Sequence, residues 1–186
     1  MTNVDIPNGD ARRSRTRQAI RSAFFGMVLE RRYYEIKIDD IVEQAGIARS
    51  TFYEHFKSKD ELLADSLEGP FSRLANLVDG SGTKQALVDI LEHFWENRGM
   101  ARGIFTGAIR KKVAATLAGM IQKKLAKQIT DKKLPLPLIS IQLSEMMLTP
   151  IAAWLLGQGT CSAEVLADVL ERSVTSTVGE LKRAAC

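Results

Sequence analysis

The stretch from residue 38 to residue 56 reads IDDIVEQAGIARSTFYEHF, and it carries most of the information about the fold of the chain. Its apolar residues recur at helical spacing on both sides of Gly46. We expect helices over 38–44 and 49–55, because a glycine supplies the left-handed backbone that a tight interhelical turn needs. Phe52 and Phe56, four residues apart, give the second of these helices one apolar face.

A longer amphipathic helix is predicted before this stretch, over 11–32, with a basic first half. If the apolar faces of the three helices pack together, they close a small core. The surface that then remains on the helix over 49–55 carries Arg49, Ser50, Tyr53 and Glu54. This is the geometry of a helix-turn-helix, whose second helix enters the major groove of DNA.

The rest of the chain is predicted to be helical as well. Ser58 is a plausible N-cap, and Glu61 three residues later completes a capping box. Further helices are expected over 59–78, 84–98, 101–131 (broken at Gly103 or Gly107), 137–156 and 162–183. The sequence therefore predicts an all-α protein of about nine helices, with a domain over 1–58 and a second over 59–186.

Three consecutive motifs give the chain a specific resemblance. Ala45-Gly46-Ile47 is followed by STFYEHF over 50–56 and KSKDELL over 57–63. Over about residues 12–65 the chain resembles the TetR family of transcriptional regulators. The resemblance implies a DNA-binding N-terminal domain and a C-terminal domain for ligand binding and dimerisation. Two positions depart from the family pattern: Ala48 replaces a common capping serine, and Lys37 replaces a threonine that caps a helix and touches a phosphate.

The resemblance also assigns roles on DNA. Tyr53 and His55 would contact the DNA backbone, and Lys59 would meet a phosphate beside the N-terminal amides of its helix. Candidates for base reading are Arg49, Ser50 and Thr51, with Arg49 first because arginine can bind guanine O6 and N7 together. Two alternatives stay open: Thr51 could bond back within its helix, and His55 could be a structural hydrogen-bonding group. The full expected DNA-binding set is Arg49, Ser50, Thr51, Tyr53, His55, Lys59, Lys37, Arg12, Arg13, Arg15 and Arg17.

The net charge of +4 is concentrated at one end of the chain. Five of the 26 cationic residues lie within positions 12–21, and without them 21 cations face 22 acids. Such a stretch can steer a chain toward a polyanion, although a solvated tail has the same composition. With the resemblance, Arg12, Arg13 and Arg15 are expected at the DNA backbone or minor groove, and Arg17 at a phosphate.

The family resemblance places a ligand pocket among the middle helices and a dimer interface on the last two. Large adaptable or polar groups are the pocket candidates, although core packing is favoured over a pocket for each of them: His93, Phe94, Trp95, Arg102, Phe105, Met120, Met146, Met147 and Trp154. Their type favours an apolar effector. The expected dimer interface comprises Leu143, Met147, Ile151, Leu155, Val165, Leu166, Val169, Leu170 and Val174.

Other classes of protein receive less support from the sequence. There is no nucleophile–base pair, paired catalytic carboxylate or phosphate loop, so no enzyme, cofactor or metal site is expected. No apolar run approaches the roughly 18 residues of a membrane span, and two cysteines cannot staple a secreted fold. We therefore expect a cytoplasmic, homodimeric repressor that a small molecule releases from operator DNA. A transcriptional activator and an interaction protein without DNA binding are the alternatives.

Overall fold

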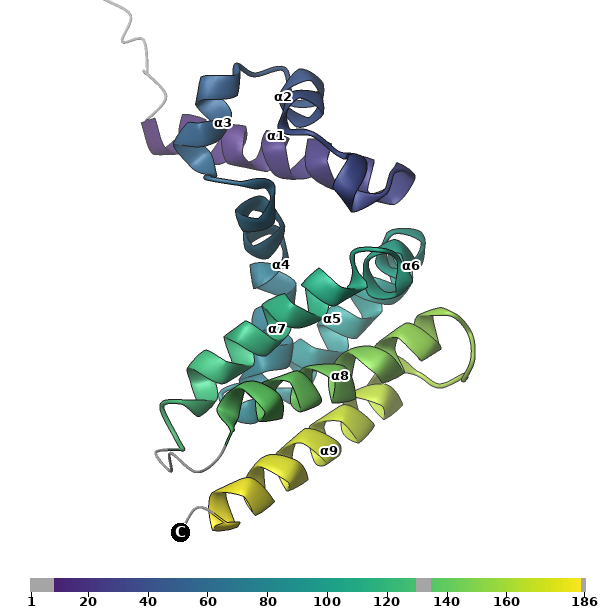
Figure 1. Ribbon diagram of the computed structural model, residues 1–186. Coiled ribbons are helices and arrows are strands. Elements are labelled where there is room, and N and C mark those ends of the chain that lie inside the picture. The colour runs from purple at the N-terminus through teal and green to yellow at the C-terminus, as the bar shows by residue number, and fades with distance from the viewer. Residues whose placement is uncertain (1–8, 130–134, 185–186) are drawn as a thin grey trace, which may run out of the picture. The chain divides into compact units, whose positions relative to one another are not determined.

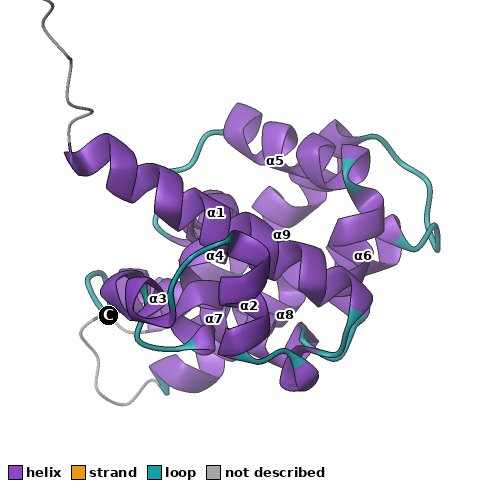
Figure 2. Ribbon diagram, turned by 90° about the horizontal axis from the view of Figure 1, so that it is seen from above, coloured by secondary structure: helices purple, strands orange, loops and turns teal. Residues whose placement is uncertain are grey.

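The computed structural model describes residues 9–129 and 135–184, and all regular structure within these ranges is helical (Figures 1 and 2). The contacts between residues divide the chain into two compact units, Met1–Ser66 and Leu67–Cys186. The elements are α1 (Gly9–Glu30), η1 (Tyr33–Glu35), α2 (Ile38–Ala45), α3 (Arg49–His55), α4 (Lys59–Ala75), η2 (Asn76–Val78), α5 (Lys84–Glu96), α6 (Arg98–Thr106), α7 (Arg110–Leu125), α8 (Leu136–Leu155) and α9 (Ala163–Ala184). The all-α prediction is confirmed.

The first unit is built as its sequence predicts. In Figure 1, α2 and α3 lie against α1. Gly46 follows α2 with a φ of 64°, in the left-handed region, and its backbone N–H caps the helix by donating to carbonyls of the preceding turn. The core is formed by apolar side chains of all four helices: Ile20, Phe24, Met27, Ile41, Phe52, Phe56, Leu62 and Leu63. Because Phe52 and Phe56 are buried, the opposite face of α3 remains at the surface.

The boundary between the units lies inside α4, after Ser66. The expected boundary at 58/59 lies at the start of the same helix. Side chains of the first turns of α4 hydrogen-bond to α1 and η1, through Asp65 and Lys59. These contacts are the physical reason why the first turns of α4 group with the N-terminal unit.

Gly107 separates α6 from α7, one of the two positions at which a break is predicted. It adopts an extended backbone with φ −78° and ψ −173°. A Cβ on this residue would lie 2.4 Å from the carbonyl oxygen of Gly103, so no larger residue fits without displacing the backbone. Gly103 itself lies within α6.

In the second unit α7, α8 and α9 lie side by side (Figure 1), and α8 is covered by both neighbours. This position corrects part of the predicted dimer interface. Most of those residues are buried in the core of this one chain: Leu143, Met147, Ile151, Leu155, Leu166, Leu170 and Val174. Val165, Val169 and Ile141 are each 52% exposed, and Leu138 is 65% exposed. Of the predicted interface residues, Val165 and Val169 therefore remain at the surface, and Leu138 and Ile141 of α8 add exposed apolar side chains that were not predicted.

α8 is an exception to the expectation that no apolar run approaches the length of a membrane span. By length and composition alone, Leu136–Leu155 is apolar enough to cross a membrane. Half of its apolar window is buried within the protein, however, as in the core helix of a helical bundle. Its apolar character is explained by the helices that cover it.

Candidate nucleic-acid interface

The outer face of α3 carries the side chains that the sequence proposes for base reading. Arg49 and Ser50 are exposed, and Tyr53 is 46% exposed, while Thr51 is half-buried. They face outward because Phe52 and Phe56 turn the other side of this short helix into the core. α3 thus presents a cation, hydroxyl groups and an aromatic ring together.

A groove of about 700 Å³ runs between the start of α1 and α3. Arg12, Arg13 and Thr16 line it from α1, and Thr51, Glu54 and His55 line it from α3. The structure therefore brings four of the predicted DNA-binding residues into one concave surface. Thr16 was not among the predicted residues, although it lies one helical turn after Arg12 and therefore on the same face of α1.

His55 lines this groove in an unusual electrostatic setting. Its Nδ1 atom is buried and has no hydrogen-bond partner among the described residues. Burial lowers the pKa of the imidazole, and the positive charges of Arg13 and Arg17 lower it further. A structural role as a hydrogen-bonding group through Nδ1 therefore has no partner to support it.

Arg17 and Arg21 contact Asp65 of α4, whereas Arg12 and Arg13 line the groove. Arg17 donates to the carboxylate of Asp65 through Nε at 3.3 Å and through Nη2, and its guanidinium lies 4.9 Å from the centre of the Phe56 ring. Arg21 donates to the Asp65 carbonyl oxygen at 2.7 Å. Both arginines thus tie α1 to α4. The contact of Arg17 with a phosphate stays a prediction, and it would compete with Asp65, which the sequence analysis missed.

Lys59 is likewise held from within the first unit. Its ammonium donates to the carbonyl oxygens of Tyr33 at 2.6 Å and Ile36 at 2.5 Å, and it lies 4.3 Å from the centre of the Tyr33 ring. The Ser58 hydroxyl accepts a hydrogen bond from Glu61 N–H at 3.1 Å, so Ser58 caps α4 as predicted. A phosphate contact by Lys59 stays a prediction. The two hydrogen bonds to carbonyl oxygens fix the position from which its ammonium group would make that contact.

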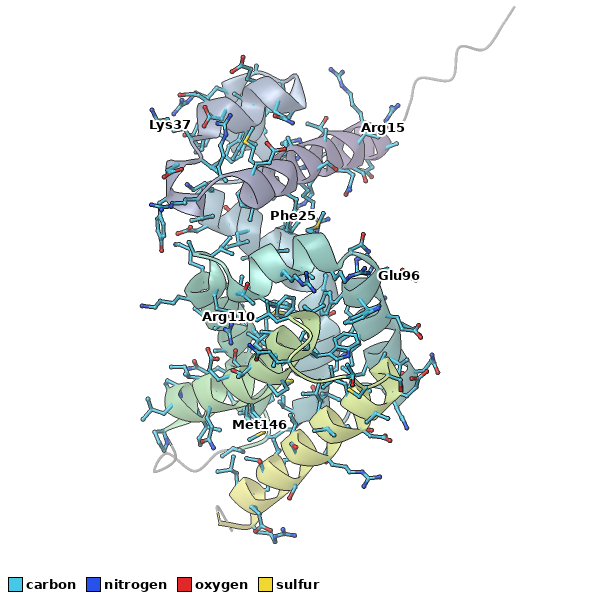
Figure 3. All side chains as sticks on the ribbon, turned by 90° about the vertical axis from the view of Figure 1, so that its right-hand side faces the viewer. Arg15, Phe25, Lys37, Glu96, Arg110 and Met146 are labelled. Carbon is cyan, nitrogen blue, oxygen red and sulfur yellow. The ribbon has the colours of Figure 1, made fainter. Side chains whose placement is uncertain are left out.

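The two departures from the family pattern have visible consequences at the helix starts. Ala48 precedes α3 without a side-chain cap. Lys37 has no acceptor to cap α2, but its own N–H donates to the Asp40 carboxylate at 3.0 Å. Lys37 and Arg15 are both exposed, near opposite ends of α1 (Figure 3). Each is therefore accessible to an anion.

Arg49 makes two contacts within the helix-turn-helix. Its Nη1 donates to the carboxylate of Asp39 on α2, and its Nη2 lies 3.4 Å from the Tyr53 hydroxyl. Its guanidinium carbon is 5.8 Å from the centre of the Tyr53 ring. The hydrogen bond to Asp39 raises the pKa of the guanidinium, and the bond to Tyr53 raises it by a smaller amount. The candidate base-reading arginine is thus oriented by its own fold.

In the second unit, only two of the predicted pocket residues meet at a described cleft. Trp95 on α5 and Trp154 on α8 have ring centres 4.7 Å apart, and both line a cleft of about 560 Å³. Three carboxylates that the sequence analysis missed share its walls: Glu92, Glu96 and Glu164. This lining differs from the apolar pocket that was expected. The residues come from α5 and from the start of α9, which are distant in sequence.

The other pocket candidates do not line this cleft, and several of them have structural roles in the second unit. Phe94 and Phe105 are buried with ring centres 5.0 Å apart, so they are core residues. Arg102 donates through Nε to the Leu155 carbonyl oxygen at 2.6 Å and thereby caps the end of α8. The remaining candidates are distributed by burial: Met147 is buried, Met120 and Met146 are half-buried, and His93 is exposed. Within the described residues no group of three potential metal ligands occurs.

Comparison with known proteins places this interface in a family. Residues 28–65 match the family described as "Bacterial regulatory proteins, tetR family". The chain is 33% identical over 91 residues to the HTH-type dhaKLM operon transcriptional activator DhaS of Lactococcus lactis, covering 48% of this chain and 49% of that protein. It is 40% identical over 60 residues to the uncharacterized HTH-type transcriptional regulator YxbF of Bacillus subtilis, covering 32% of this chain and 16% of that protein.

The chain thus spans about half the length of one curated relative and much less of the other. Among solved structures, a TetR transcriptional regulator from Streptococcus agalactiae 2603V has the same fold, with a TM-score of 0.57 and 24% identity. That alignment covers 90% of this chain and 97% of the other. The residues that match the family model build the end of α1, η1, α2, α3 and the start of α4. The helix-turn-helix segment of the chain thus matches the TetR family of bacterial regulatory proteins, which its sequence resembles, and the chain has the fold of a solved TetR regulator.

Proposed function

We propose that this protein binds double-stranded operator DNA sequence-specifically, as a homodimer, and regulates transcription in the cytoplasm. One observation carries the proposal: α3 presents Arg49, Ser50 and Tyr53 outward beside a groove lined by Arg12 and Arg13. A helix of this kind fits the major groove, and cations at its flank fit the phosphates that border the groove.

The proposed interface divides into two kinds of contact. Arg12, Arg13, Arg15, Lys37, Tyr53 and His55 would bind phosphates and fix the register of the protein on the duplex. Arg49, Ser50 and Thr51 would read base edges. Arg17 and Lys59 would support DNA binding indirectly, through the hydrogen bonds that they make within the first unit. They would also bind DNA directly where a phosphate comes within reach.

The exposed apolar side chains of α8 and α9 support a dimer. Leu138, Ile141, Val165 and Val169 are each more than half exposed. Large apolar side chains at a surface are commonly covered by a partner. A second copy would bring two recognition helices to successive major grooves, about 34–36 Å apart on the DNA.

An effector would control the dimer from the second unit. The cleft beside Trp95 and Trp154 has a volume of about 560 Å³, within the range of small-molecule sites. Its carboxylates favour an effector that combines an aromatic or apolar body with hydrogen-bond donors over a wholly apolar one. A ligand that binds one conformation of the dimer better than another would shift its affinity for DNA.

Repression by blocking a promoter is the proposed outcome, because it needs nothing beyond DNA binding. Activation is the second candidate, and one observation favours it: the chain is similar to DhaS, which is a transcriptional activator. Transcription in vitro from a promoter carrying the operator at its start site or upstream of it separates the two. Less transcript from the start-site template, with no gain from the upstream template, supports repression, and more transcript from the upstream template supports activation.

The proposed DNA binding is tested by selecting bound sequences from random duplex DNA. We expect recovery of a two-fold symmetric site whose half-sites lie about one helical turn apart. Ser50→Ala and Arg49→Ala should change the recovered sequence without changing the melting temperature, because both residues are exposed. Recovery of no common sequence, even at low salt, would contradict the proposal.

A further inference from the structure

The base-reading candidate Arg49 is held by a residue of the preceding helix. Asp39, on the first turn of α2, accepts a hydrogen bond from Nη1 of Arg49 across the turn of the helix-turn-helix. Both side chains are at the surface, with Arg49 55% and Asp39 65% exposed. An exposed ion pair of this kind contributes little to stability, so its presence suggests a role other than holding the fold together.

The two adjacent acids of α2 have separate partners. Asp40 accepts from Lys37 N–H at 3.0 Å and lies 3.7 Å from a guanidinium nitrogen of Arg31, so it caps the helix and faces α1. Asp39 faces α3 instead. Removing the Asp39 carboxylate therefore leaves the start of α2 capped.

Tyr53 restrains the same guanidinium from a second direction. It lies one turn after Arg49 on α3, with its hydroxyl 3.4 Å from Nη2 and its ring centre 5.8 Å from the guanidinium carbon. Arg49 thus contacts a carboxylate, a hydroxyl group and an aromatic ring. A guanidinium has five N–H donors in one plane, so donors remain for a base after these contacts are made.

We propose that Asp39 is a positioning residue that orients Arg49 for one guanine in each half-site. The inference rests on the proposed function, because it needs α3 to read bases. A free arginine loses rotamer entropy when it binds, and it can bond to phosphates or other bases in several geometries. An arginine fixed by Asp39 presents its remaining N–H groups in one direction and rejects base pairs without two acceptors there. Asp39 acts through Arg49 and does not itself contact the guanine.

The experiment begins by finding the base pair that Arg49 reads. Sequences selected from random DNA by the native protein and by Arg49→Ala are compared position by position. We expect one guanine per half-site to be strongly preferred by the native protein and to lose its preference in Arg49→Ala. Dissociation constants are then measured for the selected site and for the site with that base pair changed.

The decisive variant is Asp39→Asn, with Glu43→Gln as its matched control. Glu43 is exposed one turn further along α2, so the control removes one negative charge from the same helix without touching Arg49. Both variants should bind random DNA slightly more tightly, because each lowers repulsion from phosphates. Only Asp39→Asn should reduce the preference for the guanine, by about tenfold, since a good bidentate contact discriminates by roughly that amount or more.

The other positions of the selected site should keep their preferences in Asp39→Asn, and Asp39→Glu should restore part of the lost preference. The melting temperature should be unchanged in all these variants. Equal guanine preference in Asp39→Asn and the native protein would overturn the inference. So would binding of the selected site that is tighter in Asp39→Asn than in Glu43→Gln at unchanged preference, which would mean that Asp39 competes with the base for Arg49. If the native protein selects no sequence at all, the proposed function fails first and the inference with it.

Discussion

At the scale of single residues, the arginines of α1 have two different surroundings. Arg12 and Arg13 line an open groove, whereas Arg17 and Arg21 bond to Asp65, whose side chain is only 12% exposed. A poorly solvated carboxylate needs compensating charge and hydrogen bonds. The basic segment therefore serves two purposes: part of it stabilises the first unit, and part remains available to an anion.

Asp65→Asn is expected to destabilise the first unit by about 1 kcal/mol. The substitution replaces charge-assisted hydrogen bonds by neutral ones, and the partial exposure of Arg17 reduces their strength through screening. Urea denaturation measures the loss. Glu68→Gln, at an exposed position further along α4, is the matched control and should leave the denaturation midpoint unchanged. Identical midpoints for both variants would show that the Asp65 contacts add nothing to stability.

The affinity for operator DNA should increase as the pH falls from 8 to 6, through His55. Burial and the neighbouring Arg13 and Arg17 lower the pKa of this imidazole in the free protein. A bound phosphate favours the protonated form, so binding would take up a proton and strengthen as protons become available. The stability of the free protein should change in the opposite direction to its affinity for DNA. Because the pKa of His55 is lowered in the folded state, the free energy of unfolding falls as the pH drops through the ordinary histidine value of about 6.5.

The measurement is a titration of labelled operator at several pH values and constant ionic strength. His55→Gln keeps a polar side chain that does not titrate in this range. It should therefore show a flatter pH dependence than the native protein. An equally steep dependence in the variant would assign the proton uptake to another group.

At the scale of elements, most helix boundaries follow from local chemistry. α3 spans the predicted residues and α2 ends one residue later than predicted, because Gly46, Phe52 and Phe56 define the turn and the packed face within 20 residues of sequence. Contacts between distant segments were not predictable in the same way. Asp65 and Arg17 form a hydrogen bond although they are 48 positions apart in the sequence, and Glu164 and Glu92 line the same cleft. The periodicity of the sequence encodes neither pairing.

Gly107→Ala should destabilise the second unit by about 2 kcal/mol. Its Cβ would meet the Gly103 carbonyl oxygen at 2.4 Å, so the backbone between α6 and α7 must shift. Gly119→Ala, within α7, is the control: a Cβ there meets nothing within 4 Å, and alanine favours the helix by up to about 1 kcal/mol. The two variants should therefore shift the thermal midpoint in opposite directions. A midpoint raised by Gly107→Ala would contradict the close approach.

At the scale of the whole molecule, burial decides which apolar residues are available to a second copy. The sequence shows that α8 and α9 are rich in apolar residues, but it does not show which of them the same chain covers. Leu143 and Val174 are fully buried, whereas Val165 and Val169 are half exposed. The predicted interface failed where α8 is enclosed by its own neighbours, since periodicity cannot distinguish an intrachain partner from an interchain one.

Val169→Glu should weaken the proposed dimer while leaving each copy folded. A charge at a surface that a partner covers is costly, but it is tolerated when that surface faces water. Sedimentation analysis should show more monomer, with unchanged helical circular dichroism. Val174→Glu, one turn and a residue further along α9, places the same charge in the core and should unfold the second unit. A Val169→Glu protein that remains fully dimeric would move the interface away from this part of α9.

The ratio of two dissociation constants tests the central claim most directly. The native protein is titrated with its selected operator and with a scrambled duplex of equal length and composition, at the same physiological salt concentration. A sequence-specific regulator should bind the operator at least about 10³-fold more tightly, and Arg49→Ala should lower that ratio. A ratio near one for the native protein would mean that α3 reads no sequence, and it would contradict the proposed function.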